Sequence, residues 1–126
     1  MAGPLMILVA GPYRSGTDGD PARIRANLVA MTRTALELYR RGHLPVLGEW
    51  FALPLIQEAE LAGLEDAFEE LFHPIAERVL ERCDACLRIG GPSHGADEMV
   101  ALAQAHGAAI YQRIEDVPVA LDEVAT

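Results

Sequence analysis

The first residues with useful chemistry lie in a glycine-bearing segment near the start of the chain, residues 11–20, here called the arginine loop. Between its glycines it carries Tyr13, Arg14 and Ser15. Glycines let the backbone approach a ligand closely, and a guanidinium group matches the geometry of a phosphate or carboxylate. The segment is not a Walker A motif, because Thr17-Asp18 stands where that motif needs Lys-Ser/Thr. It therefore predicts either an anion-binding loop or an ordinary turn between a strand and a helix.

A second group lies in residues 90–98, here called the serine turn, which leads into a helical pattern. It brings Ser93, His94 and Gly95 to the expected N-terminus of that helix, where unpaired N–H groups suit an anion. Asp97 and Glu98 follow in the first turn, where acidic side chains also complement the helix dipole without any further role. His94 is either a hydrogen-bond donor to a ligand or a solvated turn residue.

A third pair of candidates, Glu49 and Trp50, follows a second short apolar segment. Trp50 could stack on a nucleobase while Glu49 reads the polar edge of that base. Burial of Trp50 in a core or a dimer interface is the alternative. The Cys83-Asp84-Ala85-Cys86 sequence has CxxC spacing, but it closes a helix and enters a strand, so we expect core packing rather than redox or metal chemistry.

Composition limits the classes of function. The 126 residues, 51% hydrophobic and 23% charged, predict one globular domain with one core. A net charge of −9 opposes binding to nucleic acids, and the absence of lysine excludes Schiff-base chemistry. The longest apolar run is too short for a membrane span, and no signal-peptide pattern or disulfide framework is present, so we expect a cytoplasmic protein.

The elements that must position these residues alternate along the chain. Strands are expected at residues 5–10, 43–47, 84–89 and 108–112, and helices at 21–41, 64–82 and 96–106 and after Val117. Residues 49–61 are ambiguous and are expected to contain a loop and a short helix, and Pro74 should bend or split its helix. This order predicts a single α/β domain over residues 1–126, a flavodoxin-like three-layer sandwich with a parallel sheet of four to five strands. If the first and third strands are neighbours, the arginine loop and the serine turn face each other across one crevice.

The two segments resemble motifs of the nucleoside 2-deoxyribosyltransferase superfamily, which includes deoxynucleoside monophosphate N-glycosidases. The resemblance is carried by the stretch from Ala10 to Gly16 and by the stretch from Asp84 to Glu98. It implies that Arg14 and Ser93 bind a 5′-phosphate. It also implies that a glutamate early in the last motif's helix attacks the anomeric carbon, while a second acidic group handles the proton on the departing base. Because the family assembles its sites across dimer interfaces, the resemblance further implies a homodimer or a higher homo-oligomer.

The sequence departs from the family pattern at the catalytic positions. The position of the family's glutamate is reached by counting six residues forward from Ser93, four back from Ala103 or eight back from Gly107. Each count reaches Met99 rather than Glu98. One residue is about 100° around a helix, so Glu98 should point elsewhere unless the first turn is altered. Leu8 stands where the family has a tyrosine that steadies the glutamate, and Tyr13 could substitute from the loop.

We therefore expect an N-glycosidase or deoxyribosyltransferase acting on a nucleoside or nucleoside 5′-monophosphate, with Glu98 as a displaced nucleophile and Asp97 as a proton donor. A non-catalytic nucleotide- or nucleoside-binding module is the alternative, and an oligomerisation domain is a third possibility. No cofactor, metal, nucleic acid or membrane is expected to bind. The expected substrate-binding residues are Gly11, Tyr13, Arg14, Ser15, Glu49, Trp50, Ser93, His94 and Gly95.

Overall fold

The structure, a computed structural model, describes residues 3–120. Its elements are β1 (Met6–Ala10), α1 (Pro21–Arg40), β2 (Leu44–Val46), α2 (Gly48–Leu61), α3 (Ala67–Leu80), β3 (Ala85–Arg88), α4 (His94–Ala105), β4 (Ala109–Tyr111) and a short 3₁₀ helix, η1 (Ile114–Asp116). Within the described range, no helix combines the length and the apolar character that crossing a bilayer requires.

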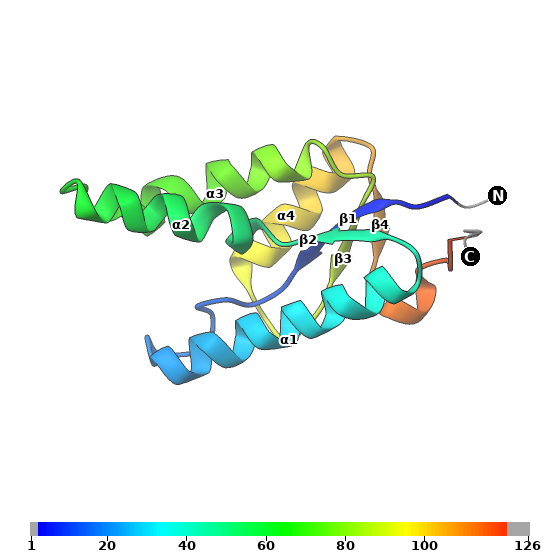
Figure 1. Cartoon of the computed structure of the whole chain (residues 1–126), viewed down its shortest axis with the longest axis horizontal. Helices are drawn as coiled ribbons and strands as arrows, with labels where there is room; N and C mark the ends of the chain where they lie inside the picture. The colour runs from blue at the N-terminus through cyan, green and yellow to red at the C-terminus, as the bar shows by residue number, and fades with distance from the viewer. Residues whose placement is uncertain (1–2, 121–126) are drawn as a thin grey trace.

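The four strands form one parallel sheet in the order β2-β1-β3-β4. Figure 1 shows α1 on one side of the sheet and the α2–α3 hairpin with α4 on the other. The predicted α/β class and flavodoxin-like sandwich are confirmed, with four strands. Since β1 and β3 are neighbours and run in the same direction, the loops that follow them leave the sheet at the same edge.

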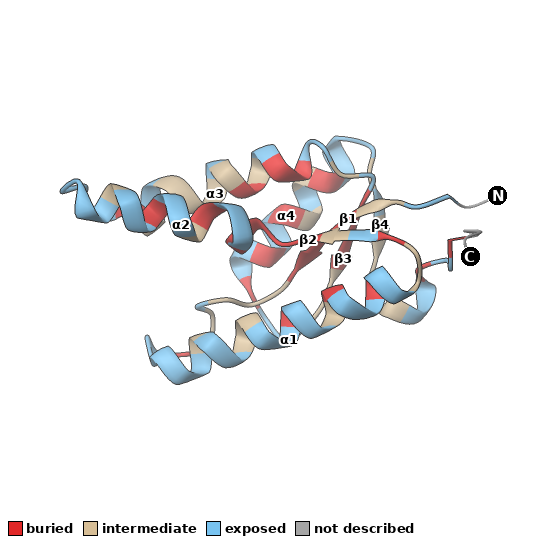
Figure 2. Ribbon diagram, viewed as in Figure 1, coloured by how far each residue is buried: buried red, intermediate tan, exposed pale blue. Residues whose placement is uncertain are grey.

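The central strand β1 is buried on both faces, as a continuous apolar run predicts. Its alternate residues Ile7 and Val9 pack in the core beneath α1, with Met31 and Leu38 among their partners. Leu8 and Ala10 pack on the other face, in a second core cluster with residues of α3 and α4. Figure 2 shows buried residues along the sheet and on the helix faces that cover it. This alternation decides which β1 side chains can reach the crevice described below.

The structure settles the ambiguous segment around Pro54 and excludes a split at Pro74. Residues 48–61 form one continuous helix, α2, although Pro54 lies inside it, and Pro74 does not split α3. The two helices pack against each other as a hairpin through a small core of Ala52, Ile56 and Ala67. Tertiary packing therefore outweighs the local cost of each proline.

The predicted short helix after Val117 is wrong for the described residues. A 3₁₀ turn lies before Val117 instead, and residues 117–120 are not helical; residues 121–126 lie outside the described range. The segment is held extended, because Arg41 Nη1 donates to the Val117 carbonyl at 3.0 Å and the Ala120 N–H donates to the Arg41 carbonyl at 2.9 Å.

The loops after β1 and β3 touch each other closely. Gly90 has a φ of +80°, and a Cβ atom there would lie 2.6 Å from Pro12 Cδ. A Cβ on Gly11 would lie 3.0 Å from Ile89 Cγ1. Glycine at position 90 thus allows both the backbone conformation and the contact between the loops.

We expect Gly90→Ala to lower the free energy of unfolding by about 2 kcal/mol or more, from left-handed backbone strain together with the clash against Pro12. Gly107→Ala is the matched control, because Gly107 has a similar φ of +82° and open space around its Cβ position. It should cost about 1 kcal/mol. Urea unfolding of both variants makes the comparison, and equal losses would show that the Pro12 contact adds nothing.

Candidate functional site

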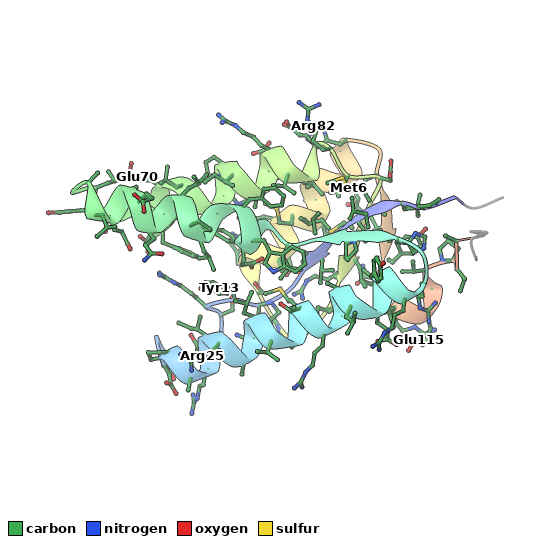
Figure 3. The ribbon with its side chains drawn as sticks, in the orientation of Figure 1. Met6, Tyr13, Arg25, Glu70, Arg82 and Glu115 are labelled. Carbon is green, nitrogen blue, oxygen red and sulfur yellow. The ribbon has the colours of Figure 1, made fainter. Side chains whose placement is uncertain are left out.

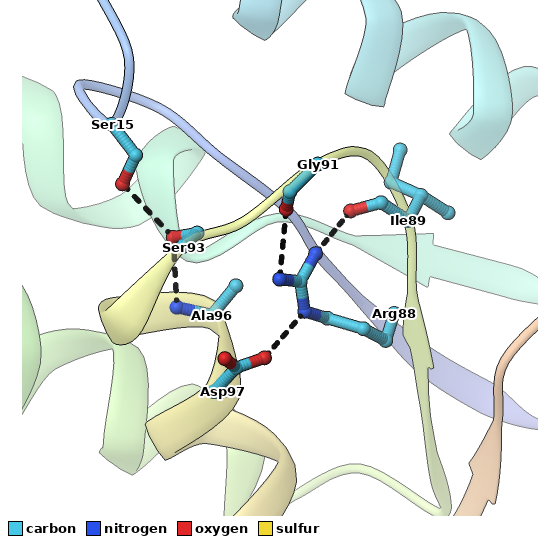
Figure 4. Close-up of polar contacts among 7 residues, drawn as sticks. All are labelled: Ser15, Arg88, Ile89, Gly91, Ser93, Ala96 and Asp97. Carbon is cyan, nitrogen blue, oxygen red and sulfur yellow. Dashed lines mark hydrogen bonds and ion pairs between the residues drawn. The ribbon is translucent and has the colours of Figure 1, made fainter.

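The arginine loop and the serine turn meet at the carboxyl edge of the sheet. Ser15 Oγ and Ser93 Oγ lie 3.1 Å apart and share a hydrogen bond, although the residues are 78 positions apart in the chain (Figure 4). Ser93 is also the N-cap of α4, because its Oγ accepts from the Ala96 N–H at 3.2 Å. The strand order therefore brings the two segments together as expected.

The arginine loop is fixed by its own hydrogen bonds. The buried Thr17 donates its hydroxyl to the Arg14 carbonyl at 2.6 Å, and Gly16 adopts a φ of +73°. Asn27 from α1 donates its side-chain amide to the Tyr13 carbonyl at 2.9 Å. The backbone of residues 13 and 14 is thus anchored on both sides.

The serine turn is organised by Arg88 at the end of β3. Its guanidinium donates to the carbonyls of Ile89 and Gly91, and its Nε lies 3.0 Å from Asp97 Oδ1 (Figure 4). Asp97 is consequently engaged on the outer side of the turn and does not line the crevice.

Between the two segments lies a crevice of about 140 Å³. Its lining residues are Gly11, Tyr13, Arg14, Ser15, Glu49, Phe68, Phe72, Ser93, Gly95 and Ala96. A smaller inner cavity of about 30 Å³ shares Gly11, Glu49 and Phe72 with the crevice and extends to Leu8 and Met99. That inner volume has room for about two water molecules.

Most of the expected binding residues are brought together here, but two are not. Trp50 lies on the outer surface of α2, with 43% of its surface exposed, and does not line the crevice. The His94 side chain is 90% exposed, and its Nε2 lies 3.3 Å from Glu98 Oε2. Stacking of a ligand on Trp50 inside this crevice is therefore not available.

The structure also answers the question of helix register. Met99 is buried and lines the inner cavity together with Leu8, as the residue count predicted. Glu98 points away, with its Oε1 3.6 Å from His73 Nδ1 and its other oxygen beside His94. Neither Glu98 nor Asp97 is among the residues that line the crevice or the inner cavity.

Glu49 is the one acidic residue among those lining the crevice and the inner cavity. It lies in the first turn of α2 and is 5% exposed. Gly48 allows that turn to press against α3, since a Cβ at Gly48 would lie 2.9 Å from Ala76 Cβ. Burial raises the pKa of the Glu49 carboxyl to about 7, and a hydrogen bond from its own backbone N–H offsets only part of the lost solvation. The carboxyl is thus poised to gain or lose a proton near neutral pH.

An aromatic cluster forms another wall of the crevice. Phe68 and Phe72, one helical turn apart on α3, stack with centroids 4.8 Å apart, and Tyr13 lies 5.8 Å from Phe68 and 6.3 Å from Phe72. Burial raises the pKa of Tyr13, partly offset by Arg14. Sequence reasoning missed Phe68 and Phe72 as site residues. Their i, i+4 spacing was the available signal, but it equally fits a core-facing helix stripe.

Arg14 lies across this cluster at the mouth of the crevice. Its guanidinium carbon is 3.7 Å from the Phe68 ring centroid, and its Nη1 is 3.5 Å from Glu69 Oε2. The guanidinium is half exposed. An anion that enters the crevice would therefore compete with Glu69 for Arg14.

Other reactive groups lie outside the crevice. Cys83 and Cys86 pack in the core between the sheet and α3–α4, and burial raises their pKa values to about 11 and about 12. Neither thiol is therefore a nucleophile at neutral pH. Glu77 in α3 and the two residues that follow the ends of α3 and α4, Glu81 and His106, bring potential metal-ligating atoms within 4.8 Å of one another.

No model of a known protein family matches the chain, and no curated protein matches it. The fold is that of a small α/β domain with a four-stranded parallel sheet.

Removal of the carboxylate that competes for Arg14 should strengthen anion binding. We expect Glu69→Gln to increase the affinity for inorganic phosphate roughly two- to five-fold, since an exposed ion pair contributes up to about 1 kcal/mol. Titration calorimetry measures the change. Glu70→Gln is the control, because it removes the same charge from the next position on α3 and Glu70 makes no ion pair with Arg14. Equal gains in both variants would reduce the effect to net charge alone.

Proposed function

We propose that the crevice binds a nucleoside 5′-monophosphate. The phosphate lies between Arg14, the two serines and the N-terminus of α4, and the base extends toward Glu49 and the aromatic cluster. The hydrogen bond between Ser15 and Ser93 carries this proposal, because it joins an arginine-bearing loop to a capped helix N-terminus in one crevice. The resemblance to the deoxyribosyltransferase superfamily supports the choice of ligand class.

The phosphate end has donors of several kinds. Ser93 Oγ accepts from Ala96 and shares a hydrogen bond with Ser15, so one of the two hydroxyl hydrogens stays available to a ligand. The first N–H groups of α4, at His94 and Gly95, have no acceptor within the helix. Arg14 adds a planar cation that fits a phosphate. Together these groups would favour an anion at this position, although the net charge of the chain is −9.

The base end is apolar with one polar group. Phe72 and Tyr13 offer ring faces, and Glu49 offers the polar atoms. The volume of about 140 Å³ is below the roughly 300–1,000 Å³ of typical ligand pockets, so it encloses only part of a nucleotide. The rest of the ligand would remain in contact with solvent.

Binding without cleavage is the form of this function that the geometry favours. Nucleophilic cleavage of an N-glycosidic bond by the family's route needs a carboxylate facing the sugar, and Glu98 and Asp97 lie outside the crevice while Met99 and Leu8 line its inner end. N-glycosidase or deoxyribosyltransferase activity is the second candidate. It is favoured by Glu49, since a buried acid with a pKa of about 7 can protonate a departing base at neutral pH.

Thermal shifts and calorimetry with nucleosides and their 5′-monophosphates test the binding proposal. We expect the monophosphates to bind more tightly than the matching nucleosides and to raise the melting temperature. Arg14→Gln should weaken monophosphate binding roughly 10- to 100-fold, as expected for a lost charge-assisted hydrogen bond. Arg25→Gln, on the exposed part of α1 (Figure 3), should change nothing.

Equal affinity for nucleosides and monophosphates would overturn the phosphate site. Chromatography of the same mixtures for free base then separates the two candidates. Base release that disappears in Glu49→Gln and persists in Glu98→Ala would favour the enzyme, and absence of release would favour the binding module.

We also propose a second copy of this chain as the partner. A groove of about 620 Å³ between α2 and α3 is lined mainly by apolar side chains, including the exposed Phe51 and Leu55. Trp50 lines this groove and also a second hollow toward α1. Met6 and Arg82 border the same groove (Figure 3). Such an exposed apolar surface is typical of an interaction site.

Light scattering during size-exclusion chromatography tests the dimer. We expect a dimer that Leu55→Glu converts to a monomer, because a charge would be buried in the apolar contact. Leu61→Glu is the control, since Leu61 is 75% exposed on the same helix and does not line the groove. A wild-type protein that stays monomeric at high concentration would rule the dimer out.

A further inference from the structure

We propose that Glu77, Glu81 and His106 bind one Zn²⁺ ion, which joins the C-terminal end of α3 to that of α4. This site lies away from the crevice and does not depend on the proposed nucleotide site. Its residues come from two separate parts of the chain, so their spacing in the sequence does not indicate a metal site.

The three side chains converge from the ends of two helices. Glu77 lies in the last turn of α3, Glu81 follows that helix, and His106 follows α4. One ligating atom of each lies within 4.8 Å of the others, and His106 Nε2 is 4.0 Å from Glu81 Oε2. Ligands of a tetrahedral zinc ion stand about 3.3 Å apart, because each bond is about 2.0–2.1 Å long. Side-chain rotations that close each gap by about 1.5 Å or less therefore suffice to form the site.

The backbones that carry these side chains are fixed by a buried contact between α3 and α4. Both helices contribute to one core cluster, which includes Ala76 and Leu80 of α3 and Ala103 of α4. Figure 1 shows the two helices side by side, with their last turns at the same end of the molecule. Metal binding thus needs only side-chain motion, since Glu81 and His106 are exposed.

The charges at the end of α3 favour a cation. Glu77 and Glu81 lie one helical turn apart, and like charges at this spacing repel each other. Both also lie at the C-terminal end of the helix, where the helix dipole disfavours negative charge. Among the residues that the structure describes, His106 is the only basic one within ion-pair distance of either carboxylate. A divalent cation would offset both unfavourable effects.

The neighbouring arginines do not neutralise these carboxylates. Arg78 and Arg82 each follow one of the glutamates in the sequence, but both line the apolar groove between α2 and α3. One residue is about 100° around a helix, so Arg78 occupies a different face of α3 from Glu77. The two carboxylates therefore stay available to a metal ion.

The ligand set selects among divalent cations. An imidazole with two carboxylates suits Zn²⁺, whereas Mg²⁺ and Ca²⁺ prefer oxygen ligands alone. Three protein ligands leave a fourth position for water. His106 lies at the opposite end of α4 from Ser93, about 20 Å along the helix axis. The ion would consequently brace the two helices rather than act in the crevice.

Calorimetric titration of Zn²⁺ into the metal-free protein tests this site. We expect one Zn²⁺ per chain and no binding of Mg²⁺ at the same concentrations. His106→Asn and Glu77→Gln should each weaken zinc binding by about ten-fold or more, because each removes one of three ligands. Zinc should also raise the melting temperature of the wild-type protein, and raise it less in either variant.

His73→Asn is the matched control. The His73 side chain is 39% exposed, against 40% for His106, and its Nδ1 lies 3.6 Å from Glu98 Oε1. In the described part of the chain no second carboxylate completes a ligand set there, so this variant should bind zinc as the wild-type protein does.

Three results would overturn the proposal: no zinc binding by the wild-type protein, unchanged binding in His106→Asn, or binding that is lost in His73→Asn instead. Glu77→Gln gives an independent measurement if His106→Asn does not fold. Unchanged zinc affinity in that variant would equally remove Glu77 from the site.

Discussion

The site depends on the close contact between the loops that follow β1 and β3. Adjacent parallel strands release their loops at the same edge of the sheet, but they do not by themselves hold those loops together. Gly90 provides the missing contact, because its backbone conformation and lack of a side chain let Pro12 pack directly against it. The hydrogen bond between Ser15 and Ser93 then fixes the arginine loop to the start of α4.

This contact places polar donors at the mouth of the crevice and leaves its inner end apolar. The serines and the α4 N-terminus line the crevice, while Leu8 and Met99 line the inner cavity. Glu49 stands at the boundary, where it loses solvation without gaining a cation. The chemistry of the crevice is consequently that of one buried acid rather than of a carboxylate pair.

The sequence predicted the parts of this arrangement that follow from periodicity. The apolar run of β1 and the glycines after it indicated a central strand and its loop. For Met99 the signal was different, because the inward-facing position was counted from the motif spacing of the family that the chain resembles. The exposed position of Trp50 and the aromatic wall could not be predicted in this way. Both depend on how the α2–α3 hairpin packs, and the sequence predicted a loop within residues 49–61 and a bend or break at Pro74 instead.

The packing of that hairpin explains how an acidic protein can keep an arginine ready for an anion. Glu69 and Phe68 on α3 hold the Arg14 guanidinium at the crevice mouth, through an ion pair and a stacking contact. An incoming phosphate would exchange one anionic partner of Arg14 for another, while the Phe68 contact could persist throughout. The arginine is therefore partly ordered before binding, which reduces the entropy cost of fixing its side chain. The stacking contact with Phe68 is the part of this restraint that does not also compete with the ligand for the arginine.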